Sequence, residues 1–384
     1  MIYLDNCSTS KPRKEVVEIM TGALMDYFGN PSSLHRLGMV SEKKVREARD
    51  YIAKYLDVNR DEIYFTSGGT ESNNIAIQSA VNKLKNRGDH IITTKIEHPS
   101  VVNIMKNYER QGLEVTYLDV DNLGNISLEE LEASIKDNTI LISIIHVNNE
   151  IGTIAPIDKI KAIINKKNPK TLFHVDGVQG FGKVEFSLKA SGIDMYSFSG
   201  HKIYGPKGIG GLYIDRKHSL EPIVFGGNQE KGLRSGTENV PGIMGFGGAV
   251  RIIDENFIQE SELVHKLKEY FISRIKEEIG DIKVNTSLDE GSSPYILNVS
   301  FRNVRGEVLL HYLEDDNIYV STSSACSSKG TEKSHVLKAI GLNNNEIEGS
   351  IRFCFSYENT IEELDKTVES LKKAVAEIRQ ITMR

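Results

Sequence analysis

Residues 62–85, EIYFTSGGTESNNIAIQSAVNKLK, contain a β-branched and aromatic run, a pair of glycines and a segment of helical character. The pattern predicts a strand over 62–66 and a helix over 72–85. Glycines let a ligand approach the backbone closely, and a helix N-terminus attracts a phosphate group. An ordinary turn with a Thr or Ser cap explains the same letters. This stretch alone therefore leaves both interpretations open.

The alternation of strand-like and helix-like segments extends from residue 61 to about residue 215. Helix-like runs occupy 101–110 and 128–135, and the further strand-like runs are 90–94, 115–120, 140–146, 171–175, 195–199 and 210–214. Such alternation predicts an α/β fold with a largely parallel sheet. Ligands bind such sheets at the carboxyl ends of their strands, which is where the chemically interesting residues fall.

The pattern changes beyond residue 240. A helical stretch covers about 242–279, short strands follow at 296–301 and 351–355, and a charged helix covers 361–378. These features predict a second, smaller α+β domain. We expect a large domain over 16–256 and a small domain made of 1–15 and 257–384, although the pattern itself does not require the N-terminal residues to join the small domain.

Composition excludes several classes of protein. The net charge is −6, and Lys and Arg are spread through the chain, which argues against direct nucleic-acid binding. No apolar run reaches the roughly 18 residues of a membrane span, and the start lacks a signal pattern. The cysteines, at positions 7, 326 and 354, are too few and too scattered for a disulfide framework or a cysteine-rich metal site. We expect a cytoplasmic protein.

Residues 197–208, SFSGHKIYGPKG, place Lys202 directly after a predicted strand and between glycines. Pro206 breaks the pattern of a phosphate-binding P-loop. A desolvated lysine with a lowered pKa can form a Schiff base with an aldehyde. A solvated surface lysine is the alternative.

Asp176 ends another predicted strand, and a buried carboxylate there needs a partner. A pyridinium nitrogen is one possible partner; a helix cap is the other interpretation. The phosphate cradle, the lysine and this acid together are the parts that pyridoxal 5'-phosphate requires.

Seven segments resemble those of cysteine desulfurases, the NifS/IscS-like members of the class-V aminotransferase group. They occur in the family's order at 3–6, 69–74, 97–101, 146–152, 174–176, 199–208 and 234–239. The resemblance implies a fold-type-I pyridoxal-phosphate-dependent transferase that acts as a homodimer.

The resemblance also implies roles for individual residues. Lys202 carries the cofactor, Asp176 contacts the ring nitrogen, and His98 stacks on the ring as a candidate acid or base. The remaining cofactor contacts fall on Gly69, Thr70, Asn149, Gln179, Ser199, His201 and, from the second subunit, Thr237. Arg352 and Asn30 fall on contacts to the substrate carboxylate.

The implied reaction converts L-cysteine to L-alanine and leaves a persulfide on Cys326, for iron–sulfur cluster assembly or for tRNA or cofactor thiolation through a sulfur-acceptor protein. A surface thiol in a flexible turn is the alternative for Cys326. The rivals are a selenocysteine lyase, an aminotransferase, or a persulfide carrier without turnover. Cys354 is predicted to be a small buried hydrophobe, and Cys7, which replaces an alanine common in the family, has no assigned role.

Overall fold

The computed structural model describes residues 1–322 and 333–382. Cys326 therefore lies outside the described residues. The chain folds around two sheets, one of seven strands and one of four, and a further pair of short strands contains the N-terminus.

The seven-stranded sheet has the order β2 (Ile63–Thr66), β8 (Gly210–Ile214), β7 (Met195–Ser199), β6 (Leu172–Asp176), β5 (Thr139–Ile145), β3 (His90–Thr94) and β4 (Glu114–Leu118). All neighbours pair in parallel except β8, which runs antiparallel to both β2 and β7. Residues 200–209 join β7 to β8 without an α-helix, so the connection is too short for a parallel crossover. The predicted α/β fold with a largely parallel sheet is confirmed, with residues 210–214 as its reversed strand.

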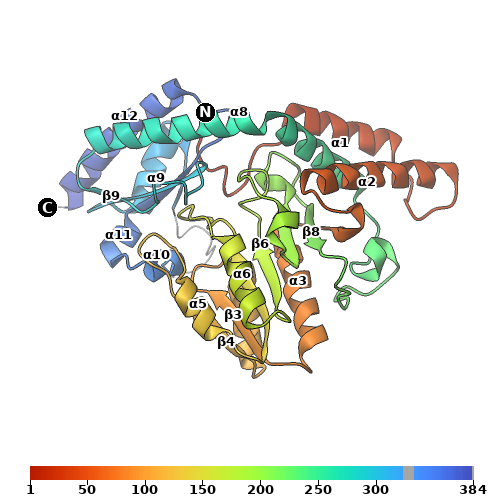
Figure 1. The fold of residues 1–384 in the computed structure, drawn as a ribbon. Helices are drawn as coiled ribbons and strands as arrows, with labels where there is room; N and C mark the ends of the chain where they lie inside the picture. Colours follow the sequence, from red (N-terminus) through yellow and green to blue (C-terminus); the bar gives the residue numbers. More distant parts are fainter. Residues whose placement is uncertain (323–332, 383–384) are drawn as a thin grey trace.

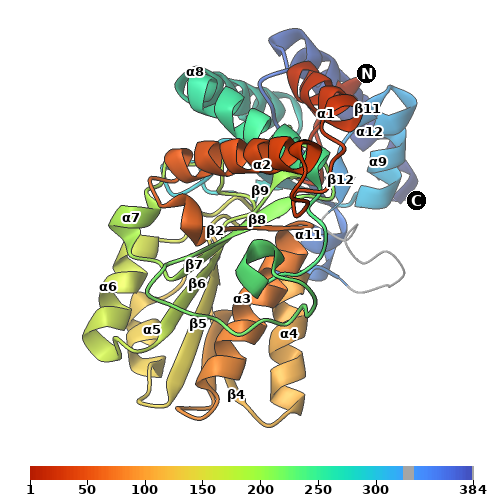
Figure 2. The same cartoon turned by 90° about the vertical axis from the view of Figure 1, so that its right-hand side faces the viewer.

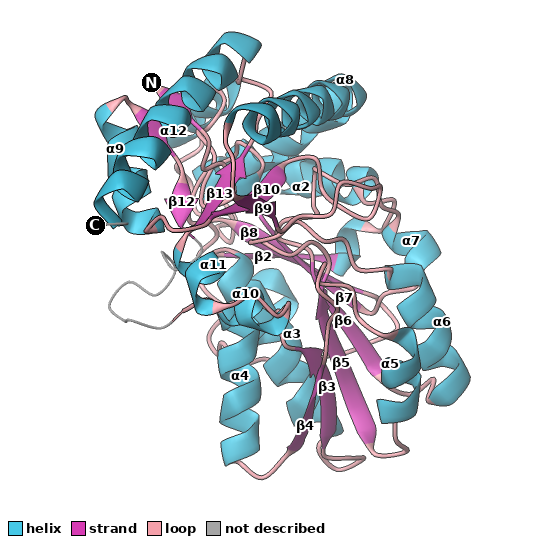
Figure 3. Ribbon diagram, turned by 90° about the vertical axis from the view of Figure 1, so that its left-hand side faces the viewer, coloured by secondary structure: helices cyan, strands magenta, loops and turns pink. Residues whose placement is uncertain are grey.

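Helices cover both faces of this sheet. α3 (Gly69–Leu84) and α4 (Pro99–Arg110) lie on one face, whereas α5 (Leu128–Ser134), α6 (Ile157–Lys167) and α7 (Leu188–Ser191) lie on the other (Figure 3). Every residue of β3, β5, β6, β7 and β8 is buried. Burial on both faces explains why these strands consist of near-continuous β-branched and aromatic runs instead of an alternating pattern.

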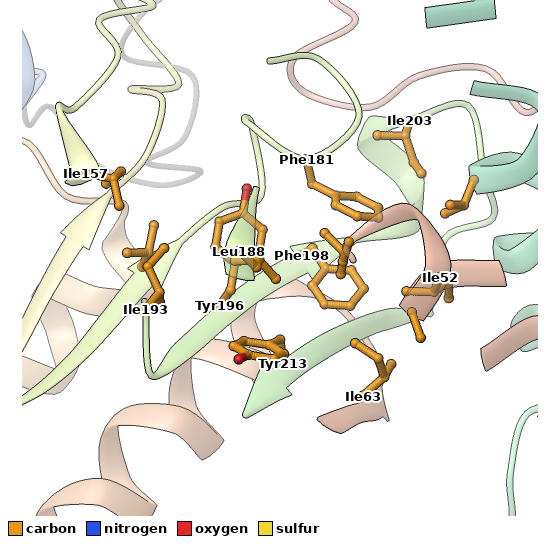
Figure 4. Close-up of a cluster of buried hydrophobic side chains, with 14 of the residues drawn as sticks. Ile52, Ile63, Ile157, Phe181, Leu188, Ile193, Tyr196, Phe198, Ile203 and Tyr213 are labelled. Carbon is orange, nitrogen blue, oxygen red and sulfur yellow. The ribbon is translucent and has the colours of Figure 1, made fainter. Parts of the chain in front are cut away.

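An aromatic cluster forms the centre of the large core (Figure 4). The rings of Phe181 and Phe198 lie 4.6 Å apart between their centroids, and Phe246 of α8 (Val240–Glu278) packs 5.8 Å from Phe198. α1 (Lys14–Asp26) and α2 (Arg36–Tyr55) pack on the same part of α8. A Cβ atom on Gly247 would lie 2.7 Å from the Cβ of Ala48, so a side chain there would push α2 away.

The second sheet has the order β12 (Ser321–Thr322), β13 (Ser350–Cys354), β10 (Ile296–Phe301) and β9 (Ile282–Val284). It packs with α9 (Gly306–Asp315), α12 (Ile361–Thr382) and the distal half of α8 around a separate core (Figure 1). α10 (His335–Ala339) and α11 (Asn344–Glu348) complete this part. At the N-terminus, β1 (Ile2–Tyr3) pairs in parallel with β11 (Ile318–Tyr319), and Leu4 joins the same core.

α8 is one continuous helix with residues in both cores, Phe246 in the first and Phe271 in the second. Figure 2 shows it crossing above the large sheet together with α2. The separate cores support our proposal of a large domain over 16–256 and a small domain of 1–15 and 257–384. Within the described ranges, no helix has both the length and the apolar character required to traverse a lipid bilayer.

We expect Phe198→Ala to lower the free energy of unfolding by about 3–5 kcal/mol, because it removes a fully buried ring from the aromatic cluster. The matched control is Ile258→Ala on the exposed surface of α8, which should change it by less than about 0.5 kcal/mol. Urea denaturation followed by circular dichroism measures both. Equal midpoints for the two variants would contradict the packing described.

Candidate active site

A cavity of about 590 Å³ opens at the carboxyl ends of β2, β5, β6 and β7. It brings together nine of the residues predicted from the sequence: Gly69, Thr70, His98, Asn149, Asp176, Gln179, His201, Lys202 and Arg352. Residues from the large sheet, from the N-terminal segment and from β13 of the small domain therefore meet in one place. The position agrees with the rule for ligand sites in open α/β sheets.

Lys202 ends the short 3-10 helix η2 (Gly200–Lys202), which directly follows β7. Its Nζ donates hydrogen bonds to the backbone oxygens of Cys7 and Ser8, at 2.5 Å and 2.8 Å. Burial lowers the pKa of the amine to about 8, since the charged form loses its hydration. An amine in this condition is deprotonated in part near neutral pH and is then a nucleophile.

The chain turns sharply after Lys202. Tyr204 has φ +59°, a left-handed conformation that costs of order 1–3 kcal/mol for a residue with a bulky side chain. Ser10 holds this turn, because its Oγ accepts from the Tyr204 N–H at 2.6 Å and donates to the His201 oxygen at 2.9 Å. The Arg13 N–H also donates to the Tyr204 oxygen at 3.0 Å. The N-terminal segment thus fixes the backbone that positions Lys202.

Asp176 is the last residue of β6 and is almost completely buried. Its two carboxylate oxygens accept from Asn73 Nδ2 at 2.7 Å and from the Val178 N–H at 3.1 Å. Hydrogen bonds of this kind stabilise a carboxylate in its charged form. The sequence reasoning missed Asn73; its signal is its place four residues after Gly69 on α3, on the helix face that meets the sheet.

His98 is the N-cap of α4, whose first residue is Pro99. Its Nδ1 accepts from the Ser100 N–H at 3.1 Å and lies 2.8 Å from Ser100 Oγ, which itself accepts from Asn73 Nδ2 at 2.9 Å. Because Nδ1 is an acceptor, the proton of the neutral ring is on Nε2. Burial lowers the pKa of His98. Hydrogen bonds through Asn73 and Ser100 thus connect Asp176 to His98. Ser100 is the second residue that sequence reasoning missed.

The turn between β2 and α3 forms a compact cradle. Gly68 has φ +153°, a conformation open almost only to glycine. A Cβ atom on Gly69 would come within 2.4 Å of Val178, so only glycine leaves this space free. Among the described residues, the buried Ser199 Oγ has no hydrogen-bond partner, and it lies 3.8 Å from the position of a Cβ on Gly68. A cradle with an unused polar atom and a helix N-terminus suits a phosphate group.

Arg352, in β13, supplies a buried cation on the opposite side of the cavity. One terminal nitrogen donates to the Asn149 oxygen at 2.8 Å, and the other donates to Asp5 Oδ1 at 2.9 Å and to Ser8 Oγ at 2.7 Å. Its Nε has no partner within the described ranges. The guanidinium is therefore fixed in place and retains donor capacity for a small carboxylate.

Three of the predicted residues that the structure describes do not line the cavity: Ser199, which is buried beneath the cradle, Asn30 and Thr237. Asn30 is exposed, and its side chain accepts from the Ser32 N–H at 2.9 Å. Thr237 is also exposed and lies outside the cavity wall of its own chain. Their roles remain predictions, as does that of Cys326.

The described residues on both sides of the segment that contains Cys326 contact residues in or next to the cavity wall. Before it, Ser321 of β12 pairs with Arg352. After it, Ser334 Oγ donates to Glu150 Oε2 at 2.6 Å, and His335 Nε2 donates to the Glu97 oxygen at 2.8 Å. Glu150 and Glu97 are the chain neighbours of Asn149 and His98, which line the cavity.

Comparison with known proteins identifies relatives of this chain. The family model of class-V aminotransferases matches residues 2–367. Cysteine desulfurase IscS from Dictyoglomus turgidum is 42% identical over 381 residues, which cover 99% of this chain and 96% of the relative. A cysteine desulfurase from a Nostoc species is 42% identical over 386 residues, covering 100% of this chain and 94% of the relative.

Solved structures agree with this. A NifS-like protein superposes with a TM-score of 0.92 at 39% identity, over 98% of this chain and 99% of its own. SspA, solved in complex with cysteine, superposes with a TM-score of 0.81 at 36% identity, over 94% of this chain and 100% of its own. The family resemblance and the fold predicted from the sequence motifs are confirmed: this chain belongs to the class-V aminotransferase family and, within it, to the cysteine desulfurases.

Proposed function

We propose that this protein is a pyridoxal-phosphate-dependent cysteine desulfurase that converts L-cysteine to L-alanine and leaves the sulfur as a persulfide on Cys326. One observation carries the proposal: a single cavity holds the Lys202 amine with its lowered pKa, the Asp176 carboxylate and the Arg352 guanidinium. The relatives' activity and the cysteine bound by SspA support the choice of substrate.

The residues present fit pyridoxal phosphate. Lys202 offers an amine to its aldehyde, and Asp176 offers a carboxylate to its ring nitrogen. The cradle formed by Gly69, Thr70 and the unpartnered Ser199 hydroxyl suits its phosphate, with His201 beside it. Burial lowers the pKa of His201 to about 4, so this ring serves as a neutral hydrogen-bonding group. Asn149, Gln179 and His98 complete the proposed contacts. When bound, the cofactor supplies an electron sink for bonds broken at the substrate α-carbon.

The protein's own side chains then have separate roles in the reaction. Arg352 binds and orients the substrate carboxylate, assisted by Asn30. Lys202 acts as a base toward the α-proton, which requires the neutral amine that burial favours. His98 carries its proton on Nε2 and can donate it to the product.

The sulfur step needs a thiolate, because a thiol is a poor nucleophile. The thiolate of Cys326 attacks the sulfur of the substrate, a sulfur–sulfur bond forms, and the carbon–sulfur bond breaks. The electron pair of that bond stays with the carbon skeleton, which takes up a proton and leaves as L-alanine.

We also propose a homodimer in which Thr237 completes the phosphate site of the second subunit. Exposed apolar side chains support this: they include Leu24, Met25, Phe28, Leu34, Leu37 and Met39. They gather where the end of α1 meets the start of α2, since Ser41 Oγ of α2 donates to the Tyr27 oxygen at 3.0 Å. A sulfur-acceptor protein of iron–sulfur cluster assembly or of tRNA or cofactor thiolation would receive the persulfide, and we place this exchange in the cytoplasm.

The decisive assay measures alanine and sulfide released from L-cysteine in the presence of pyridoxal phosphate and a thiol reductant. We expect Lys202→Ala and Cys326→Ala to lose at least a hundredfold in turnover, because each removes a reacting group. Lys166→Ala, at an exposed position on α6, is the control and should keep wild-type turnover. Full conversion of cysteine to alanine by Cys326→Ser would overturn the persulfide route.

Lys202 should show an unusual pH dependence before the cofactor is added. We expect its reaction with an acylating reagent to be half-maximal near pH 8, since the neutral amine is the reactive form and burial lowers the pKa. A solvated lysine standard in the same tube reacts with a midpoint near 10.4. Peptide mass mapping of protein freed of cofactor measures the labelled fraction. Coincident profiles for Lys202 and the standard would refute the predicted environment.

Arg352→Lys should raise KM for L-cysteine roughly ten- to hundredfold, because a single ammonium replaces a planar fork worth about 1.5–3 kcal/mol in charged hydrogen bonds. We expect kcat to change less than KM, since the carboxylate is bound in both the ground state and the transition state. Steady-state kinetics decide this. An unchanged KM with reduced kcat would show that Arg352 does not hold the substrate.

A further inference from the structure

We propose that Cys7 and Cys354 form a redox-active dithiol in the wall of the active-site cavity, which a two-electron oxidant such as a peroxide converts into a disulfide. The pair is separate from the sulfur-transfer cysteine, and its chemistry does not depend on turnover of L-cysteine.

The backbone brings the two residues together although they are far apart in sequence. The Cys354 N–H donates to the Leu4 oxygen at 2.7 Å, and Asn6 Nδ2 donates to the Cys354 oxygen at 3.0 Å. A bridge between Asp5 and Cys354 continues this pairing. The segment that contains Cys7 is thereby held against the end of β13: Cys7 Sγ lies 4.0 Å from the Tyr295 oxygen, which accepts from the N–H of Phe355, the residue after Cys354. Neither thiol is in a disulfide in the structure.

The two thiols differ in access. Cys7 lines the active-site cavity, whereas Cys354 does not, and both are otherwise buried, at 1% and 0% exposure. A small oxidant that enters the cavity therefore meets Cys7 first. Cys354 does not line the cavity, and it lies beside the segment that contains Cys7.

The two thiols also differ in protonation. Burial raises the pKa of Cys7, but the neighbouring Cys354 and the charges of Lys183, Arg352 and Lys202 outweigh it and bring the value to about 6. Burial, together with the neighbouring Cys7, raises the pKa of Cys354 well above its usual range. Cys7 is therefore the more acidic of the two thiols, an asymmetry that favours oxidation at Cys7.

The proposed reaction balances in two steps. The Cys7 thiolate attacks a peroxide oxygen, the oxygen–oxygen bond breaks, and the products are a sulfenic acid on Cys7 and hydroxide. The hydroxide takes the proton of Cys354, whose thiolate then attacks the sulfur of Cys7, forms the sulfur–sulfur bond and displaces hydroxide. The two thiols have together given two electrons to the peroxide.

This disulfide would form next to residues of the proposed active site. The Cys7 oxygen accepts from Lys202 Nζ at 2.5 Å and from Gln179 Nε2 at 2.9 Å, and Arg352 lies two residues before Cys354. A negative charge on Cys7 raises the pKa of Lys202. Oxidation removes that charge and therefore lowers the pKa of Lys202. Oxidation of the dithiol would thus change the surroundings of the Lys202 amine and of the Arg352 guanidinium.

The test uses the full chain with Cys326→Ser, so that Cys7 and Cys354 are its only thiols. The reduced protein is treated with hydrogen peroxide, denatured, alkylated with iodoacetamide and mapped without reduction. We expect equal loss of alkylation at both cysteines and a cross-linked peptide pair lighter by two hydrogen atoms, with both effects reversed by dithiothreitol.

Two further proteins make the result specific. In Cys326→Ser with Cys354→Ser, Cys7 should progress to sulfinic acid, because no resolving thiol remains; in Cys326→Ser with Cys7→Ala, Cys354 should stay fully alkylatable. Circular dichroism confirms that each protein is folded. The proposal fails if both cysteines of the Cys326→Ser protein remain alkylatable, if Cys7 overoxidises while Cys354 is untouched, or if the cross-link joins two chains.

Discussion

The hydrogen bonds between Lys202 Nζ and the backbone oxygens of Cys7 and Ser8 are the contacts on which the site depends. They join a loop of the large sheet to the N-terminal segment, which also contacts the small domain through Leu4 and β13. Backbone oxygens are suited to this task, because they hold an amine in either protonation state without adding charge. The lysine can therefore lose its proton, or change its bonding, while its surroundings keep their position.

Three buried cations lie in or beside the cavity. Lys183, Lys202 and Arg352 are all largely buried, and buried cations are costly unless anions or oxygen atoms face them. Asp5 and Ser8 face Arg352. Arg352 suits the carboxylate of the substrate class proposed here, and Glu71 and Asp176 give the same wall negative charge. The charges of Lys183, Arg352 and Lys202 explain why Cys7 in this wall becomes acidic.

Sequence reasoning predicted the elements better than the connections between side chains. Strands 90–94, 195–199 and 210–214 match the structure residue for residue, because burial on both faces gives continuous runs that end at glycines or polar residues. The reversed direction of 210–214 depends on loop length, which strand patterns do not record. Asn73 and Ser100 carry no motif of their own, and their role exists only because α3 and α4 start side by side. Asn30 and Thr237 do not line this chain's cavity. Thr237 is predicted to act in the second subunit, whereas Asn30 is predicted to contact the substrate, and both roles stay predictions.

The two domains supply different groups to the proposed site, and this limits how far the domains can move relative to each other. The amine proposed to react follows β7 of the large sheet, whereas the guanidinium proposed to hold the substrate belongs to β13 of the small domain. A substrate held by both fixes the distance between them, and effective catalysis tolerates little error in that distance. Two covalent connections span the domains: the continuous helix α8 and the N-terminal segment that contacts Lys202, His201 and Tyr204. Because the second connection also contains Cys7, oxidation there acts on the joint that sets the geometry of the reaction.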